Sequence, residues 1–283
     1  MERRGETPCR RDSNRLASRV ASNGGSLVAV RILALSDVHG KMEMLRRLRE
    51  VVRGPLDAIV FTGDIVKGKA RGDEWLEANA EGREPHPGKD AITAEAEEDV
   101  SLYGEFFDLI RQWDVPTFYV PGNMDAPKRR YFEMVLQNCG ADDKICCVHG
   151  SPAFFHDFLI TGAGGEITEE AREDLFVLQV PRWEAEYLIR FVRDFPERKV
   201  FLFHTPPVGI VDMDKGQHKG SRVVNELIER YKPWLVFCGH AHNSRGKERI
   251  AESVAINPGA LKAGNYALVD SETREVEFHS LVG

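Results

Sequence analysis

From Leu27 onward, the chain alternates short apolar runs with longer segments in which apolar residues recur at helical spacing. The short runs predict strands at residues 28–35, 58–61, 117–120, 144–148, 157–161, 199–203 and 234–238. Helical stripes lie at residues 44–52, 100–113, 187–195 and 223–231. This alternation predicts an α/β domain with a largely parallel sheet covered by helices. Three closely spaced apolar runs at 249–256, 266–269 and 276–278 add an antiparallel portion.

Two segments do not follow the alternation. Residues 67–99 are polar, acidic and interrupted by Gly and Pro, and such a connection is unusually long. We interpret them as an inserted loop, either a lid or partner surface or a passive solvated excursion. Residues 1–26 lack apolar periodicity. They predict a disordered tail or a misassigned start codon, with a basic interaction arm as the alternative, which leaves 27–283 as one domain.

Composition narrows the class of partner. The net charge of −7 argues against a general nucleic-acid binder, because a phosphate-tracking surface is normally basic. The five cysteines form no CxxC pair, which indicates reduced thiols in a cytosolic protein. No apolar stretch approaches the ~18–20 residues that span a bilayer. We therefore expect a cytoplasmic protein with no membrane association.

Seven potential metal ligands follow the predicted strands. They are Asp37 and His39 in SDVHG, Asp64 in TGDI, Asn123 in PGNMD, His204 in FHTPP, and His240 and His242 in CGHAH. The carboxyl ends of strands are the edge where open α/β sheets bind ligands. Each motif alone is weak, since Asp-x-His and Gly-Asp are common in turns. Together they predict a metal site, because buried carboxylates and imidazoles need partners that offset desolvation.

The number and type of ligands predict two divalent ions. Seven side chains exceed the four or so that one Zn²⁺ accepts, and N and O donors without thiolate suit Mn, Fe or Zn. A shared carboxylate would hold two ions ~3.5–4 Å apart and allow a bridging hydroxide at neutral pH.

In this order, the five motifs resemble the calcineurin-like metallophosphoesterase superfamily, and in particular its Icc-related phosphoesterases, over residues 28 to 280. The resemblance implies a four-layer α/β/β/α sandwich of two mixed β-sheets flanked by helices. It also implies a phosphodiesterase rather than a monoesterase, which attacks a small phosphoester with the metal-bridging hydroxide. Carried over by position, Asp37, His39 and His242 hold one ion, Asp64 bridges, and Asn123, His204 and His240 hold the other. His39, Asp64 and Asn123 are the expected catalytic residues.

Met124 departs from the family pattern. Many relatives have a His at this position that protonates the leaving group, and a thioether cannot donate that proton. The enzyme should therefore favour good leaving groups or use a substitute acid. Asp125, which orients that His in relatives, is predicted to cap a helix that opens at Ala126 and Pro127.

Two further histidines are candidates for contact with substrate. His149 also ends a strand and rivals His204 as a ligand. The Thr-Pro-Pro that follows His204 resembles the family motif, and this favours His204. That leaves His149 either packed or facing substrate. His218 precedes a predicted helix start at Ser221, and is either a substrate contact, a replacement acid or an exposed loop residue.

The expected substrate is a small phosphoester, and an oligomer is possible. The rival from another class is a catalytically weak or inactive scaffold that acts through protein contacts of residues 67–99. A nuclease of the same superfamily is disfavoured by the acidic charge, so a nucleic-acid polymer is an unlikely partner.

Overall fold

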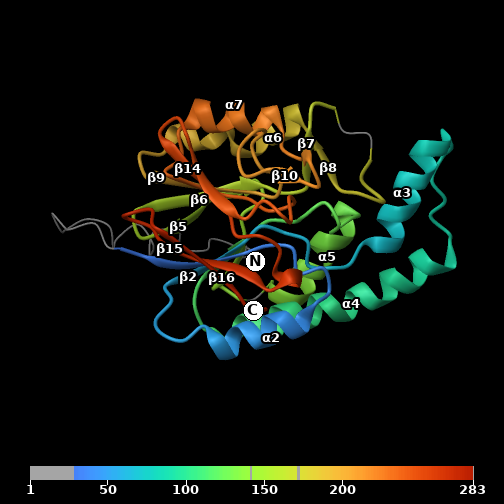
Figure 1. Cartoon of the computed structure of the whole chain (residues 1–283), viewed down its shortest axis with the longest axis horizontal. Coiled ribbons are helices and arrows are strands. Elements are labelled where there is room, and N and C mark those ends of the chain that lie inside the picture. The colour runs from blue at the N-terminus through green and yellow to red at the C-terminus, as the bar shows by residue number, and fades with distance from the viewer. Residues whose placement is uncertain (1–28, 141, 171–172, 283) are drawn as a thin grey trace, which may run out of the picture.

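The computed structural model describes residues 29–140, 142–170 and 173–282, so the predicted tail 1–26 lies outside the described residues. Two six-stranded sheets lie face to face, with helices on both outer faces (Figure 1). This arrangement confirms the predicted four-layer α/β/β/α sandwich.

Each sheet is parallel at its centre and antiparallel at an edge. The first runs β16 (Val276–Ser280), β15 (Asn265–Asp270), β1 (Arg31–Leu35), β2 (Ala58–Phe61), β3 (Thr117–Tyr119) and β4 (Ile145–Cys147). The second runs β13 (Gly246–Ile250), β14 (Ser253–Asn257), β12 (Leu235–Phe237), β9 (Arg198–Phe203), β6 (Phe158–Ala163) and β5 (Ala153–Phe155). Two short ribbons pair β7 (Glu166–Thr168) with β8 (Gln179–Pro181) and β10 (Met213–Asp214) with β11 (Gln217–His218).

Helices α2 (Met42–Val51), α4 (Asp90–Arg111) and α5 (Lys128–Cys139) pack on the first sheet, and α6 (Arg182–Ile189) and α7 (Arg222–Tyr231) on the second. Single 3-10 turns lie at Arg190–Asp194 and Leu261–Ala263. On β1, Leu33 and Leu35 face the helices, whereas Ile32 and Ala34 lie between the sheets. Because both faces of the central strands are buried, they read as continuous apolar runs.

The run 249–256 is not one strand but the hairpin of β13 and β14, which turns at Ala251 with φ of 51°. The sequence there lacks the Asn-Gly or Asp-Gly pair that usually marks such a turn, so the apolar pattern concealed it.

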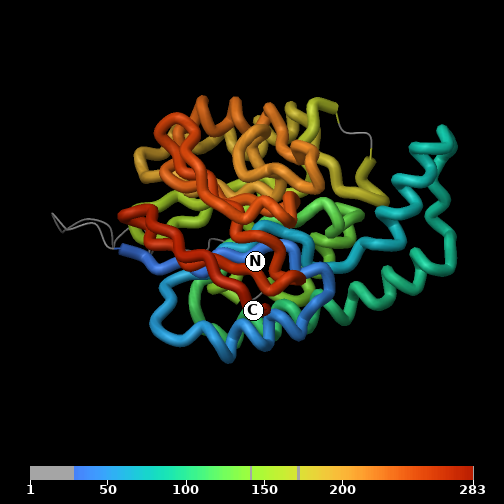
Figure 2. The backbone as a smooth tube through the Cα atoms, viewed as in Figure 1, coloured from blue at the N-terminus to red at the C-terminus, as the bar shows by residue number. Residues whose placement is uncertain are grey.

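The prediction of a loop at 67–99 is wrong. Helix α3 (Lys69–Glu81) occupies its first part, and α4 begins at Asp90. The two helices form a hairpin that projects from the body of the molecule (Figure 2). Helix α3 buries Arg71, Gly72, Glu74 and Ala78 rather than an apolar stripe, so hydrophobic periodicity does not reveal it.

No helix among the described residues combines the length and apolarity needed to cross a bilayer. Cys139, Cys146, Cys147 and Cys238 are free thiols, as predicted, and Cys9 lies outside the described residues.

Candidate metal centre

The structure brings the seven predicted ligands together at the carboxyl ends of five strands. The first sheet supplies Asp37 and His39 after β1, Asp64 after β2 and Asn123 after β3. The second sheet supplies His204 after β9, and His240 and His242 after β12. Residues from opposite ends of the chain therefore meet where the edges of both sheets converge.

The first group consists of Asp37, His39 and His242. His242 Nε2 lies 3.1 Å from Asp37 Oδ1 and 3.1 Å from His39 Nε2. With Asp64 included, one ligand atom from each of the four residues lies within 4.8 Å of the others. This spacing suits a single divalent ion bound among them.

The second group consists of Asn123, His204 and His240. Asn123 Oδ1 lies 2.8 Å from His204 Nε2 and 3.0 Å from His240 Nδ1. Asn123 and His204 are buried, whereas His240 is half-buried and lines the adjoining cavity with Asn123. An amide oxygen and two imidazoles form a neutral set of donors, which adds no further negative charge to the centre.

Asp64 lies between the two groups. Its Oδ2 is 3.4 Å from His39 Nε2 and 3.5 Å from His204 Nε2. Its Oδ1 accepts a hydrogen bond of 2.7 Å from the backbone N–H of Met124. One carboxylate oxygen therefore faces both sets of ligands.

The hydrogen bonds of His204 show that these residues fit a metal ion. His204 Nδ1 lies 2.7 Å from the carbonyl oxygen of Thr62, which can only accept, so Nδ1 carries the proton. In the neutral ring, Nε2 then presents a lone pair to Asn123 Oδ1, and two acceptors face one another. A shared cation resolves this conflict, because both atoms are good ligands for it.

Charge states in the site also suit metal binding. Burial raises the pKa of Asp37, but hydrogen bonds from His242 and His39 outweigh it and hold that pKa well below the usual range. Burial, with the nearby His204, lowers the pKa of His240 to about 4. A metal requires an anionic carboxylate and a neutral imidazole, and the pKa shifts of Asp37 and His240 favour these states.

Four of the seven ligands adopt left-handed backbone conformations that the sequence did not reveal. The φ angles are 55° at Asp37, 46° at His39, 63° at Asp64 and 63° at His240. Non-glycine residues rarely adopt such angles, and they occur where the surrounding structure requires them. Here hydrogen bonds between loops hold them, from Asp37 N–H to Gly63 O and from His39 N–H to Asp64 O, both of 2.9 Å, and from His240 N–H to Asp37 Oδ2 at 3.1 Å.

Asp125 is not the helix cap that we expected, because α5 begins three residues later at Lys128. Its buried carboxylate accepts hydrogen bonds from the backbone N–H groups of Asp64, Gly122 and Ile65, at 2.7 to 3.0 Å. The close approach of the two loops also accounts for the glycine, since a Cβ atom at Gly122 would lie 2.0 Å from Asp64 Oδ1. Asp125 therefore holds the loop of the shared ligand against the loop of Asn123.

His149 and His218 are not among the described residues that line the cavity beside the ligands. His149 Nδ1 accepts a hydrogen bond of 2.9 Å from Gly164 N–H, and burial lowers the pKa of His149 to about 3. His218 Nδ1 lies 2.9 Å from Asp212 Oδ1, and 54% of its side chain is exposed. Their predicted contact with substrate gains no support from these positions.

The cavity has a volume of about 360 Å³ and a lining that the motifs did not predict. Its further residues are Gly72, Trp75, Leu76, Met124, Glu166, Val177, Gln179, Asp214 and Lys219. Met124 belongs to the PGNMD motif, and the others come from α3 and from segments without a recognisable motif. The Trp75-Leu76 pair, an apolar dipeptide within the polar segment 67–99, was the one signal that could have pointed to them.

Fold and site together define an α/β/β/α protein with a candidate metal centre between its two sheets. The family model described as metallophosphoesterase, calcineurin superfamily, matches residues 26–281, and the chain belongs to this family. The structure is similar to a crystal structure with 30% identity and a TM-score of 0.81, covering 89% of this chain and 99% of that one.

Two further proteins are similar to this chain. The crystal structure of TT1561 of Thermus thermophilus shares 27% identity with a TM-score of 0.69, over 89% of this chain and 99% of that chain. A Methanocaldococcus jannaschii protein, MJ1162, described as uncharacterized, is 25% identical over 81% of this chain and 88% of its own length.

Proposed function

We propose that the protein is a dinuclear metal-dependent phosphodiesterase that hydrolyses a small phosphodiester by in-line attack of hydroxide on phosphorus. The observation that carries the proposal is the position of Asp64 Oδ2. It lies 3.4 Å from His39 Nε2 in the first ligand group and 3.5 Å from His204 Nε2 in the second. Asp37, His39 and His242 would hold one ion, and Asn123, His204 and His240 the second, with Asp64 shared.

Two bound Mn, Fe or Zn ions would supply positive charge for the phosphoryl oxygens and lower the pKa of water at the site. The chain's own residues fix the geometry. Asp64 and Asn123 are held by loops that Asp125 clamps together, so the ligands are preorganised. His39 lines the cavity with 12% of its side chain exposed, and in this proposal it contacts a phosphoryl oxygen of the substrate.

Charge around the cavity favours a diester over a monoester. Glu166 and Asp214 line it with Asp64, whereas Lys219 is the one lysine or arginine among the described lining residues. A phosphomonoester carries nearly two negative charges at neutral pH and a diester carries one. The bound ions would attract both esters, whereas the carboxylates of Glu166 and Asp214 repel the monoester more than the diester.

Leaving-group protonation is the missing part of the reaction, because Met124 stands where many relatives carry a histidine. An enzyme without that acid loses ~10²–10⁴ in rate on poor leaving groups. We therefore expect a preference for esters whose alcohol leaves readily.

The test is an assay of metal-reconstituted protein, with Mn²⁺ and Zn²⁺ compared. We expect bis-p-nitrophenyl phosphate to be hydrolysed faster than p-nitrophenyl phosphate. The double variant Asp64→Ala/Asn123→Ala should lose bound metal and turnover together while it keeps its circular dichroism spectrum. Faster hydrolysis of the monoester would refute the diester assignment, and metal-loaded protein without turnover on any phosphoester would favour the scaffold.

A further inference from the structure

We propose that Trp75, Leu76 and Val177 form a subsite for a planar aromatic group carried by the phosphodiester, such as a nucleobase. This inference rests on the proposed function and adds the substrate class to it. The three side chains line the same cavity as His39, Asp64, Asn123, His240 and His242. A substrate whose phosphate reaches the ligands would therefore meet this apolar surface with another part of its structure.

The three residues differ in exposure and therefore in what they contribute to the subsite. Val177 is buried at 4% exposure and belongs to an apolar cluster with Ile92 and Phe176, against which Trp75 packs. Leu76, in contrast, is 67% exposed at the cavity. Trp75 thus has a fixed support, and Leu76 offers apolar surface that a ligand can cover. An indole and aliphatic side chains in one cavity lining favour a flat ring.

The subsite is anchored to the metal centre. Arg71 on α3 is 4% exposed and donates to the carbonyl oxygen of Met124 at 3.1 Å, next to Asn123. The same guanidinium pairs with Asp99 on α4 at 2.8 Å. A shift of α3 would break both contacts. The aromatic subsite and the ligands therefore keep a fixed spacing.

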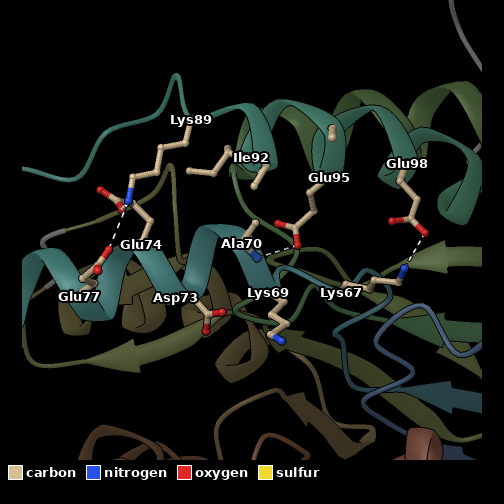
Figure 3. A pocket seen from close by; sticks show the side chains of 12 residues that line it. Lys67, Lys69, Ala70, Asp73, Glu74, Glu77, Lys89, Ile92, Glu95 and Glu98 are labelled. Carbon is tan, nitrogen blue, oxygen red and sulfur yellow. Dashed lines mark hydrogen bonds and ion pairs between the residues drawn. The ribbon is translucent and has the colours of Figure 1, made fainter.

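Helix α4 also secures the start of α3 (Figure 3). Gly68, the residue before α3, provides no capping side chain, and Glu95 takes that role by accepting from Ala70 N–H at 2.8 Å. Lys67 pairs with Glu98 at 2.6 Å, and Lys89 pairs with Glu77 at 3.2 Å. These contacts hold α3 and the residues before it against α4.

Met124 lies between the metal ligands and helix α3, which carries Trp75 and Leu76. A Cβ atom at Gly68 would lie 2.8 Å from Met124 Sδ, and one at Gly72 would lie 3.2 Å from Met124 Cε. The two glycines therefore let α3 approach the thioether closely. The side chain at position 124 supports the wall of the subsite, which gives a physical role to the residue that departs from the family pattern.

The size of the cavity limits the ligand. A volume of about 360 Å³ is near the lower end of the ~300–1,000 Å³ typical of small-molecule sites. It suits a mononucleotide-sized diester.

The experiment compares ligands that differ only in the ring. Adenosine 5′-monophosphate and ribose 5-phosphate are titrated into the Mn²⁺-loaded protein by calorimetry, and both are tested as inhibitors of bis-p-nitrophenyl phosphate hydrolysis. We expect the nucleotide to bind about tenfold more tightly, as stacking on an aromatic side chain provides. Phenyl phosphate and methyl phosphate form a second pair, which separates a general aryl subsite from one that needs a nucleobase.

Matched variants locate the effect. Leu76→Ala should reduce the nucleotide preference several-fold, whereas Leu136→Ala, at a helical leucine that is 70% exposed outside the cavity lining, should leave it unchanged. Trp75→Phe should weaken it and remove fluorescence quenching by the nucleotide. Equal binding of ribose 5-phosphate and nucleotide, or a preference untouched by both variants, would overturn the subsite. Diester hydrolysis would persist in that case, whereas failure of the proposed function would abolish it.

Discussion

The cavity has two walls, and the chain builds them in different ways. The ligand wall, made of the seven predicted metal ligands, comes from loops that directly follow strands, with four ligands at positive φ. The hairpin wall, made of Trp75 and Leu76, comes from a helix that buries an ion pair of Arg71 with Asp99 and packs Trp75 on a small apolar cluster. The first wall must present particular atoms at particular points, and the second must provide only shape and apolar surface.

The largest expected effect concerns a buried ligand. We expect His204→Ala to reduce bound metal from two ions to one and diesterase turnover to background. Mutation of residues that only hydrogen-bond to a metal ligand already lowers metal affinity or activity ~10–100-fold, and loss of the ligand itself should cost more. Metal analysis and the diesterase assay measure both. His218→Ala is the matched control, since that exposed ring pairs with Asp212 outside the cavity lining. Equal losses in the two variants would show that His204 has no special role.

The ligand wall could be predicted from the sequence, whereas the hairpin wall could not. The seven candidate ligands could be predicted, because carboxylate, amide and imidazole side chains that follow successive strands indicate a shared metal site. The loop predicted at 67–99 was wrong, since α3 lacks an apolar stripe and depends on Arg71, Glu95 and Asp99, which are far apart in sequence. The role of Asp125 was missed for a related reason. Its hydrogen bonds reach back some sixty residues to the Asp64 loop, and short motifs do not record such contacts.

A smaller effect tests the anchor of the hairpin wall. Arg71→Met keeps most of the side-chain volume but leaves the buried Asp99 unpaired, and we expect a loss of ~3 kcal/mol in the free energy of unfolding. Arg46→Met removes a comparable pair with Glu105 on the same helix α4, but Arg46 is 55% exposed, so its loss should stay below ~1 kcal/mol. Denaturant unfolding measures both. Similar losses would mean that burial does not distinguish the two pairs.

The smallest effect is a difference in the pH dependence of metal affinity between the first and the second group of ligands. Burial lowers the pKa of His39, but the carboxylates of Asp64 and Asp37 raise it by a larger amount. The net pKa therefore lies above 6.5. In metal-free protein, this contribution to stability is present below pH 6.5 and is lost as the pH rises through the raised pKa. Protons therefore compete with metal at His39, and affinity should fall by up to about tenfold per pH unit on acidification.

His240 behaves in the opposite way. Its pKa is lowered to about 4, so its ring stays neutral and available until the pH approaches that value. Metal titrations between pH 5 and 8 should show the ion at Asp37, His39 and His242 leaving first. Loss of both ions in one step at the same pH would contradict this order.

The most direct test of the central claim is a crystal structure of Mn²⁺- or Zn²⁺-loaded protein, with the ions located by anomalous scattering. The account predicts two peaks ~3.5–4 Å apart, one among Asp37, His39 and His242, the other among Asn123, His204 and His240, with Asp64 touching both. A single peak at full metal loading, or two ions bound away from Asp64, would contradict it.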